Sequence, residues 1–292
     1  MLRVRVGSAC IPPVVSPTIT GMRRLKSLRD DRSFRTFETN MTDRQHLAQC
    51  FDALLEPEKF RDYGPNGLQV EGRREIRKIV SGVTASLALI EAAVRADADT
   101  IFVHHGLFWR GQDGRVTGWM KQRLAMLLAH DINLFAYHLP LDAHPDLGNN
   151  AQLGRLLGLT TLGRFGEQNL GFLGARADCG RFENAGVLGR HVETLLGRSV
   201  TVVGPGDKPI MQLAWCTGGA QNYFEAAIAA GADAFITGEI SEPQAHYARE
   251  CGVAYLACGH HATERYGAPA VASHVAHQLS LEHVFIDIDN PA

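Results

Sequence analysis

Residues 78–106 read KIVSGVTASLALIEAAVRADADTIFVHHG, and this stretch decides the fold class. A β-branched run at 78–83 is followed by the apolar spacing of a helix at 87–96. A second run at 100–103 then ends on His104, His105 and Gly106. Two strands joined by one helix form a βαβ crossover, so the strands are expected to be parallel. The stretch therefore predicts an α/β fold with histidines at the carboxyl end of a strand.

The same alternation continues on both sides of this unit. Short apolar runs predict strands at 78–83, 100–103, 132–137, 210–217, 234–237, 253–258 and 283–288. Amphipathic segments between them predict helices at 87–96, 118–130, 149–157, 182–196, 221–230, 242–251 and 262–279. We therefore expect an α/β protein built of mainly parallel βαβ units.

A weak internal repeat indicates how these units are grouped. A shift of 134 residues places Glu91-Ala-Ala-Val on Glu225-Ala-Ala-Ile, and it overlays strand on strand and helix on helix. The repeat predicts two similar lobes, about 41–160 and 161–292, with the functional site between them. Residues 161–209 are glycine-rich with a helix of their own, and we interpret them as an insertion.

Side chains that bind metals follow four of the predicted strands. In chain order they are His104 and His105, His138 and Asp142, Glu239, and His260 and Glu264. Each one alone is more often a packed or solvated side chain, but strand ends of this kind meet at one edge of a sheet. Imidazole combined with carboxylate suits Zn, Mn, Fe, Co or Ni, and does not favour Ca or Mg. The predicted metal ligands are His104, His105, Asp142, His260 and Glu264, which fit two divalent ions with Glu264 placed to bridge them.

Composition excludes several other classes of protein. The chain has 292 residues and a net charge of −2, so it has no overall electrostatic attraction to nucleic acid or acidic membranes. No apolar run reaches the roughly 18 residues of a transmembrane helix. Its six cysteines form no C-x-x-C pair, which argues against a thiolate zinc site and suits a reducing, cytoplasmic location.

The N-terminal segment differs in composition from the remaining chain. Residues 1–40 hold eight basic and three acidic residues together with three prolines, and they show no helical or strand periodicity. An Arg-rich segment poor in acids is also typical of a targeting peptide, but its prolines suit a transit helix poorly. We interpret residues 1–40 as a disordered extension or a mis-assigned start, with the fold beginning near Met41.

Three motifs resemble the Nif-three-like family, many of whose bacterial members are labelled GTP cyclohydrolase 1 type 2 homologue. The motifs are DYGPNGLQVEG at 62–72, VHHGLFW at 103–109 and GHHATER at 259–265. The resemblance covers about Met41 to Ala292 and is to the short bacterial form. It implies a two-lobed α/β fold, a dinuclear metal site and a homo-hexameric ring with the sites facing its interior. The metal-ligand pattern of the family carries over onto His104, His105, Asp142, His260 and Glu264, and His144 and His261 become candidates for contacts to ligands or substrate.

Three classes of function are compatible with these residues. The first is a metal-dependent hydrolase that uses a metal-bound hydroxide, since no Gly-x-Ser-x-Gly elbow appears and no cysteine lies in the three motifs. The resemblance suggests a purine nucleotide or other small molecule as its substrate. The second is a metal-handling protein, and the third is a ring that acts as a scaffold. Glu239 and His138 are not among the predicted ligands, and a protein that only held metal would not need them. We therefore predict that they are the catalytic residues.

Two further motifs remain ambiguous. The loop Thr217-Gly-Gly-Ala lies between a strand and a helix, where backbone N–H groups could cradle a phosphate, but a tight turn is an equal alternative. Arg110, with Lys121 and Arg123 nearby, could bind an anionic substrate, although the latter two are typical of a solvated helix face. A ring could also thread nucleic acid, but the acidic body of the chain disfavours this.

Overall fold

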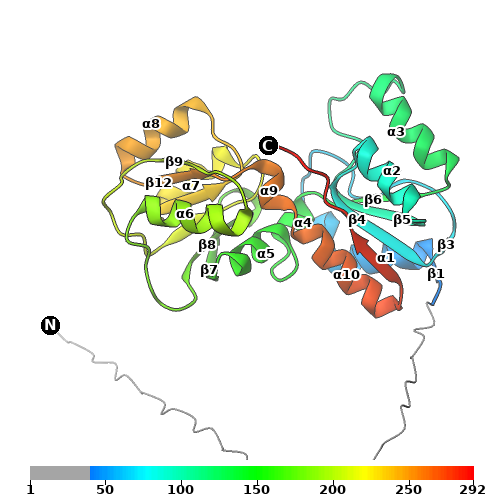
Figure 1. The fold of residues 1–292 in the computed structure, drawn as a ribbon, viewed down its shortest axis with the longest axis horizontal. Coiled ribbons are helices and arrows are strands. Elements are labelled where there is room, and N and C mark those ends of the chain that lie inside the picture. Colours follow the sequence, from blue (N-terminus) through cyan, green and yellow to red (C-terminus); the bar gives the residue numbers. More distant parts are fainter. Residues whose placement is uncertain (1–39) are drawn as a thin grey trace, which may run out of the picture. The chain divides into compact units, whose positions relative to one another are not determined.

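The computed structural model describes residues 40–292, so the predicted N-terminal extension lies outside the described residues except for residue 40. The described chain forms a five-stranded sheet, a six-stranded sheet and a two-stranded ribbon, with helices on the faces of the two larger sheets (Figure 1). The ribbon consists of β1 (Thr42–Asp43) and β3 (Glu75–Ile76). The predicted α/β class is confirmed. None of the helices between residues 40 and 292 has the length and apolar character needed to cross a membrane.

The first sheet has the strand order β13-β4-β5-β6-β2. These strands are β13 (Glu282–Phe285), β4 (Lys78–Thr84), β5 (Thr100–His105), β6 (Asn133–Ala136) and β2 (Gly67–Val70). The first four are parallel, and β2 pairs antiparallel with β6 at the edge.

Successive side chains of these strands face opposite helical layers. Phe102 and Phe135 pack with α1 (Arg44–Leu55) and α10 (Gly267–Leu279). Their neighbours Ile101 and Leu134 pack with α2 (Leu87–Arg95) and α3 (Gly118–Ala129). The near-continuous apolar runs of the sequence are therefore strands buried on both faces.

The second sheet has the order β7-β8-β10-β11-β12-β9. Its strands are β7 (Leu159–Phe165), β8 (Gly171–Arg176), β10 (Leu213–Trp215), β11 (Ala234–Thr237), β12 (Ala254–Ala257) and β9 (Thr201–Val203). Only β10, β11 and β12 are parallel to one another, and β7, β8 and β9 pair antiparallel.

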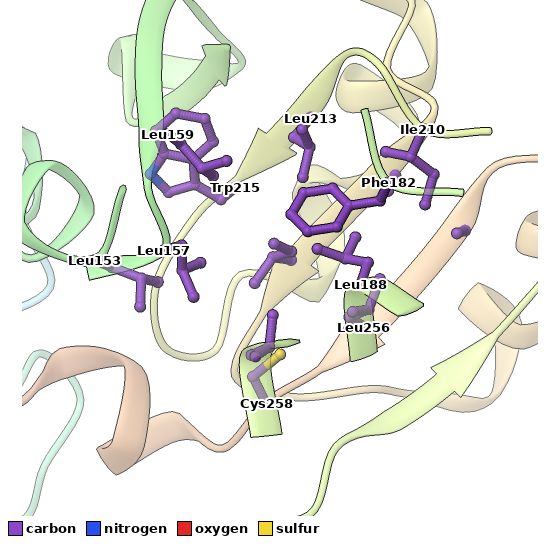
Figure 2. Packing of buried hydrophobic residues seen from close by; sticks show 14 of the residues in the cluster. Leu153, Leu157, Leu159, Phe182, Leu188, Ile210, Leu213, Trp215, Leu256 and Cys258 are labelled. Carbon is purple, nitrogen blue, oxygen red and sulfur yellow. The ribbon is translucent and has the colours of Figure 1, made fainter. Parts of the chain in front are cut away.

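Helices cover both faces of the second sheet as well. One face packs with α5 (Asn149–Leu156) and α6 (Ala185–Leu196), and Figure 2 shows Leu213, Phe182 and Leu188 meeting in this layer beside Trp215. The other face packs with α7 (Phe224–Ala229) and α8 (Glu242–Cys251). Three short 3-10 helices lie in connections, at Pro57–Lys59, Glu167–Asn169 and Gln221–Tyr223.

The structure corrects two parts of the predicted organisation. Residues 161–209 are not an insertion, because they supply β8 and β9, most of β7, and α6 of the second sheet. Their antiparallel pairs make the sheets mixed where mainly parallel units were expected. The division into two lobes at residue 160 stays a prediction, and β13 near the C-terminus pairs with β4 of the first sheet. The predicted helix 262–279 is two helices, α9 (His260–Glu264) and α10, because the chain leaves helical geometry between them. The proposed duplication stays a prediction.

Candidate metal centre

Parallel pairing brings the metal-binding side chains together. β5 pairs with β6 in register Val103↔Ala136, so the residues that follow, His104 and His138, come side by side with ring centroids 4.9 Å apart. β11 and β12 are likewise parallel neighbours, and α9 begins directly after β12. Three overlapping groups of potential ligand atoms result, each within 4.8 Å: His104, His105 and His138; His105, His260 and Glu264; and His104, Asp142 and Glu264.

The carboxylate of Glu264 lies at the middle of these groups. Its Oε1 is 3.4 Å from His104 Nε2, and its Oε2 is 3.3 Å from His105 Nε2 and 3.1 Å from His260 Nε2. The residue is only 2% exposed. The buried carboxylate of Glu264 thus faces three imidazoles. His104 belongs to one of the two groups that contain Glu264, and His105 and His260 belong to the other. A ligand that bridges two ions needs contacts of this kind.

Asp142 approaches the same ring nitrogen of His104 that Glu264 faces. It lies in the short helix α4 (Leu139–Ala143), and its Oδ1 is 3.5 Å from His104 Nε2. The same oxygen accepts hydrogen bonds from Asn149 Nδ2 at 2.9 Å and from Thr217 Oγ1 at 3.2 Å. Burial raises the pKa of Asp142, and the hydrogen bond from Asn149 opposes this by favouring the charged carboxylate. The two donors also fix the position of Oδ1 near His104.

Two atoms of the group are buried without a hydrogen-bond partner, His104 Nε2 and Glu264 Oε2. A buried polar atom left unpaired costs about 1–3 kcal/mol, so such atoms call for a specific explanation. Both face the common centre, among imidazole nitrogens and carboxylate oxygens that suit a divalent transition metal. The residues therefore fit a bound metal ion.

Each of the four imidazoles is oriented by a hydrogen bond at Nδ1. The partners are the Tyr137 carbonyl for His104, Thr84 Oγ1 for His105, Glu239 Oε1 for His260 and Asp62 Oδ1 for His138. For His104, His105 and His260 this leaves Nε2 turned toward Glu264. An imidazole that donates one N–H to a carbonyl or carboxylate is the usual arrangement of a metal-ligating histidine.

Electrostatics within the group shift several pKa values. Burial lowers the pKa of His104, but the neighbouring carboxylates of Asp142 and Glu264 outweigh it and raise that pKa to about 9. The pKa of His260 is also raised to about 9, because Glu264 and Glu239 outweigh its burial. Burial lowers the pKa of His105 to about 3. At neutral pH His104 and His260 therefore carry protons that a metal ion must displace.

The group forms one end of a cavity of about 460 Å³. Asp142, His105, His138, His260 and Glu264 all contribute to its lining. The remaining lining is mostly apolar or aromatic and consists of Tyr63, Trp109, Leu139, Leu170, Cys216, Thr217, Gly219, Ala220 and Tyr223. A pocket of this volume with convergent polar groups at its base is the usual form of a small-molecule site.

The predicted catalytic residues occupy different places in the site. Glu239 lies outside the three groups and touches the site through its 2.6 Å hydrogen bond to His260. His138 belongs to one of the groups, and Asp62 holds it at 2.7 Å. Asp62 begins the first of the three motifs but had no predicted role. Thr84 and Asn149, which also support the site, were not predicted as site residues.

Other residues singled out in the sequence lie away from the group. His144 Nδ1 accepts hydrogen bonds from the backbone of Asp146 and Leu147, and His261 pairs with Asp287 at 2.8 Å. Arg123 stacks on Trp119, 4.7 Å from the ring centroid. His144 and His261 therefore have partners of their own, and within the described chain their side chains form no hydrogen bond to the candidate ligands.

The glycine loop after β10 packs closely against the side chain of Glu264. The Gly218 N–H donates to Thr263 Oγ1, and the Gly218 carbonyl accepts from Gly238 N. A Cβ atom on Gly218 would lie 1.8 Å from Glu264 Oε1. The loop is therefore a tight turn that makes room for the carboxylate, and its Gly218 N–H is not available to a phosphate.

Fold and site together define an α/β protein with a candidate divalent-metal centre where its strand ends meet. The model of the family Duf34/NIF3 (NGG1p interacting factor 3) matches residues 42–291. The chain belongs to this family, as its three motifs indicated.

The relatives agree over nearly their whole length. A Neisseria meningitidis protein named "GTP cyclohydrolase 1 type 2 homolog" is 51% identical over 85% of this chain and 98% of its own. A Pseudomonas aeruginosa protein of the same name is 50% identical over 84% of this chain and 97% of its own. The solved structure of protein ybgI, described as of unknown function, is 45% identical with a TM-score of 0.81, over 86% of this chain and 100% of that one.

Proposed function

We propose that this protein binds two divalent transition-metal ions and is a metal-dependent hydrolase. The observation that carries the proposal is the position of Glu264, whose buried carboxylate is shared by two of the three ligand groups. His104 and Asp142 would hold one ion with Glu264, and His105 and His260 would hold the other with it. The identity of the ions is open among Zn, Mn, Fe, Co and Ni.

Bound divalent ions act as Lewis acids and lower the pKa of water to about 7, which supplies the chemistry of hydrolysis at neutral pH. The protein's own residues do the remaining work. Asp62 orients His138 in the lining of the cavity, with Asp62 Oδ1 2.7 Å from Nδ1. His138 is the residue placed to carry a proton to or from a substrate.

Glu239 differs from His138 in its proposed role, because its carboxylate is hydrogen-bonded to the candidate ligand His260. A carboxylate bonded to the Nδ1 of a ligating histidine fixes its tautomer and raises its basicity. Glu239 is therefore proposed to position His260, and its predicted part in proton transfer becomes the alternative.

The name of the relatives makes a purine nucleotide the first substrate to test. The test is a screen of metal-loaded protein against nucleotides, phosphoesters and small cyclic amides, with His138→Asn beside the native protein. We expect turnover of at least one class, and a loss of about 10²–10⁴-fold in His138→Asn with both ions retained. Fully metal-loaded protein that turns over none of these compounds would contradict the hydrolase and favour a metal-handling protein. Loss of an ion from His138→Asn would make His138 a ligand.

The homo-hexameric ring implied by the family resemblance, and the cytoplasmic location favoured by the cysteine pattern, are part of the same proposal. Light scattering coupled to size-exclusion chromatography tests the ring directly: six copies are expected, and a monomer or dimer would contradict it.

A further inference from the structure

The walls of the cavity differ in character from its metal-binding end. We propose that the cavity takes an uncharged planar ring, of the size of a nucleobase or a cyclic amide, that stacks on Trp109, and that it offers no side-chain site for a phosphate. This inference rests on the proposed function, because it names the class of substrate for the same site.

Three aromatic side chains line the cavity: Tyr63, Trp109 and Tyr223. The Trp109 ring meets His138 edge-on, with centroids 5.0 Å apart at 88°, and lies 6.0 Å from the ring of His105. The indole therefore stands directly beside the candidate ligands. A flat ring that lies against this indole is within reach of the atoms that would hold the ions.

The other two aromatic rings that line the cavity differ in how firmly they are held. Tyr223 donates a hydrogen bond from its hydroxyl to the Glu167 carbonyl at 3.1 Å, and its ring packs on Gly166. The backbone of Tyr63 is bonded on both sides, to Asp62 Oδ1 and to the Arg110 N–H, while the residue is 61% exposed. The anchored ring of Tyr223 loses little conformational entropy when it binds a flat ligand, whereas the ring of Tyr63 is free to adjust to it.

The cavity lacks the side chains that bind phosphate. No Lys or Arg is among the residues that line it, and Asp142 and Glu264 add negative charge at its base. Arg110 borders a separate hollow on the outer side of Tyr63 and Trp109, and its Nη2 already donates to the Asp62 carbonyl at 2.7 Å. Because phosphate recognition relies on Arg, Lys or free backbone N–H groups, a nucleoside triphosphate gains nothing from these side chains.

The experiment compares guanosine with guanosine 5′-monophosphate, two probes that differ only in the phosphate. Equilibrium dialysis against metal-loaded and chelator-treated protein gives both dissociation constants, and metal content is measured in each sample. Inorganic phosphate serves as a competitor, since bound ions could hold it. The variants are Trp109→Ala, Trp109→Phe and Arg110→Gln, with Trp119→Phe on the exposed side of α3 as the matched control.

We expect guanosine to bind at least as tightly as its monophosphate in chelator-treated protein, where no ion can hold the phosphate. Trp109→Ala removes one stacking partner, so it should weaken both probes by about 5–150-fold. Trp109→Phe should restore binding to within about threefold, and Arg110→Gln and Trp119→Phe should leave it unchanged. Unchanged metal content in Trp109→Ala would show that the loss concerns the ring.

Two results would overturn the inference. One is monophosphate binding more than about tenfold tighter than guanosine in chelator-treated protein, above all if Arg110→Gln abolishes the difference. The other is no binding of guanosine, adenosine, uridine or free uracil at all. The proposed function fails separately: nucleoside binding that needs Trp109 but is never followed by turnover would leave the ring site standing and remove the hydrolase.

Discussion

Replacement of Gly218 by alanine tests how tightly the centre is built. Gly218 has φ of +70°, and a Cβ atom there would lie 1.8 Å from Glu264 Oε1 and 3.1 Å from His260 Nε2. Because Cβ contacts shorter than 3.0 Å essentially do not occur, the Glu264 carboxylate must move by roughly 1.2 Å. Metal–ligand distances tolerate only about 0.2 Å. We therefore expect Gly218→Ala to lose at least about 100-fold in metal affinity.

The neighbouring glycine supplies the matched control. A Cβ atom on Gly219 would lie 3.4 Å from His260 Cε1 and 3.6 Å from Glu239 Cδ, and its φ is not positive. Gly219→Ala should therefore keep native metal affinity.

Both affinities can be measured by competition with a chromophoric chelator, and circular dichroism checks the fold. The left-handed backbone adds about 1–2 kcal/mol of destabilisation to Gly218→Ala, or a few degrees in Tm. Folded Gly218→Ala that binds metal as tightly as Gly219→Ala would refute the placement of the ions against Glu264.

Four further predictions concern individual residues of the centre and its support. Glu239→Gln should weaken metal binding by about 10–100-fold, because it disturbs the orientation of His260. If the variant keeps native metal affinity but turns over substrate about 10²-fold more slowly, the result would instead support proton transfer by Glu239. Since the pKa values of His104 and His260 are raised to about 9, metal affinity should rise with pH up to about 9, by about tenfold per pH unit for each proton displaced. The raised pKa values of His104 and His260 stabilise chelator-treated protein fully below pH 6.5, and this stability should fall as pH rises through 9. Chelator competition measures the metal affinity and thermal melts measure the stability across this pH range. Metal affinity or stability that does not change with pH would contradict these predictions. Asn149→Ala should lower the free energy of unfolding by about 1–3 kcal/mol, because it removes a buried donor to Asp142 and leaves a backbone N–H unpaired, and a change below about 0.5 kcal/mol in urea unfolding would count against this.

Sequence patterns predicted the parts of the fold that local chemistry determines. Strands β4, β5, β11 and β12 are continuous β-branched or apolar runs, because they are buried on both faces. Their carboxyl ends meet at one place, so the convergence of histidines and carboxylates could be anticipated from chain order alone.

The missed elements depend on partners distant in the chain. β7 and β8 contain Gly163, Gly171 and Gly174, and their exposed threonines break any alternation. These strands form because they pair with each other and with β10. No local pattern indicates such pairing, so the segment resembled an insertion.

The hydrogen bonds that orient the ligands could not be predicted either, because they join residues that are distant in the chain. Asp62 reaches His138 across 76 positions of the chain, and Thr84 reaches His105 across two neighbouring strands. The ligands are recognisable by residue type, but the hydrogen bonds that orient them exist only in the folded chain. Glu239 was for this reason predicted as a catalytic residue, while its contact to His260 points to a positioning role.

Anomalous diffraction from crystals of protein prepared without chelator shows whether two ions share the Glu264 carboxylate. Data on either side of the absorption edge of the metal found by elemental analysis locate each ion independently of any refined coordinates. We expect two peaks per chain, about 3.5–4 Å apart, with the Glu264 carboxylate between them. One peak per chain, or two peaks that do not share Glu264, would contradict the dinuclear centre.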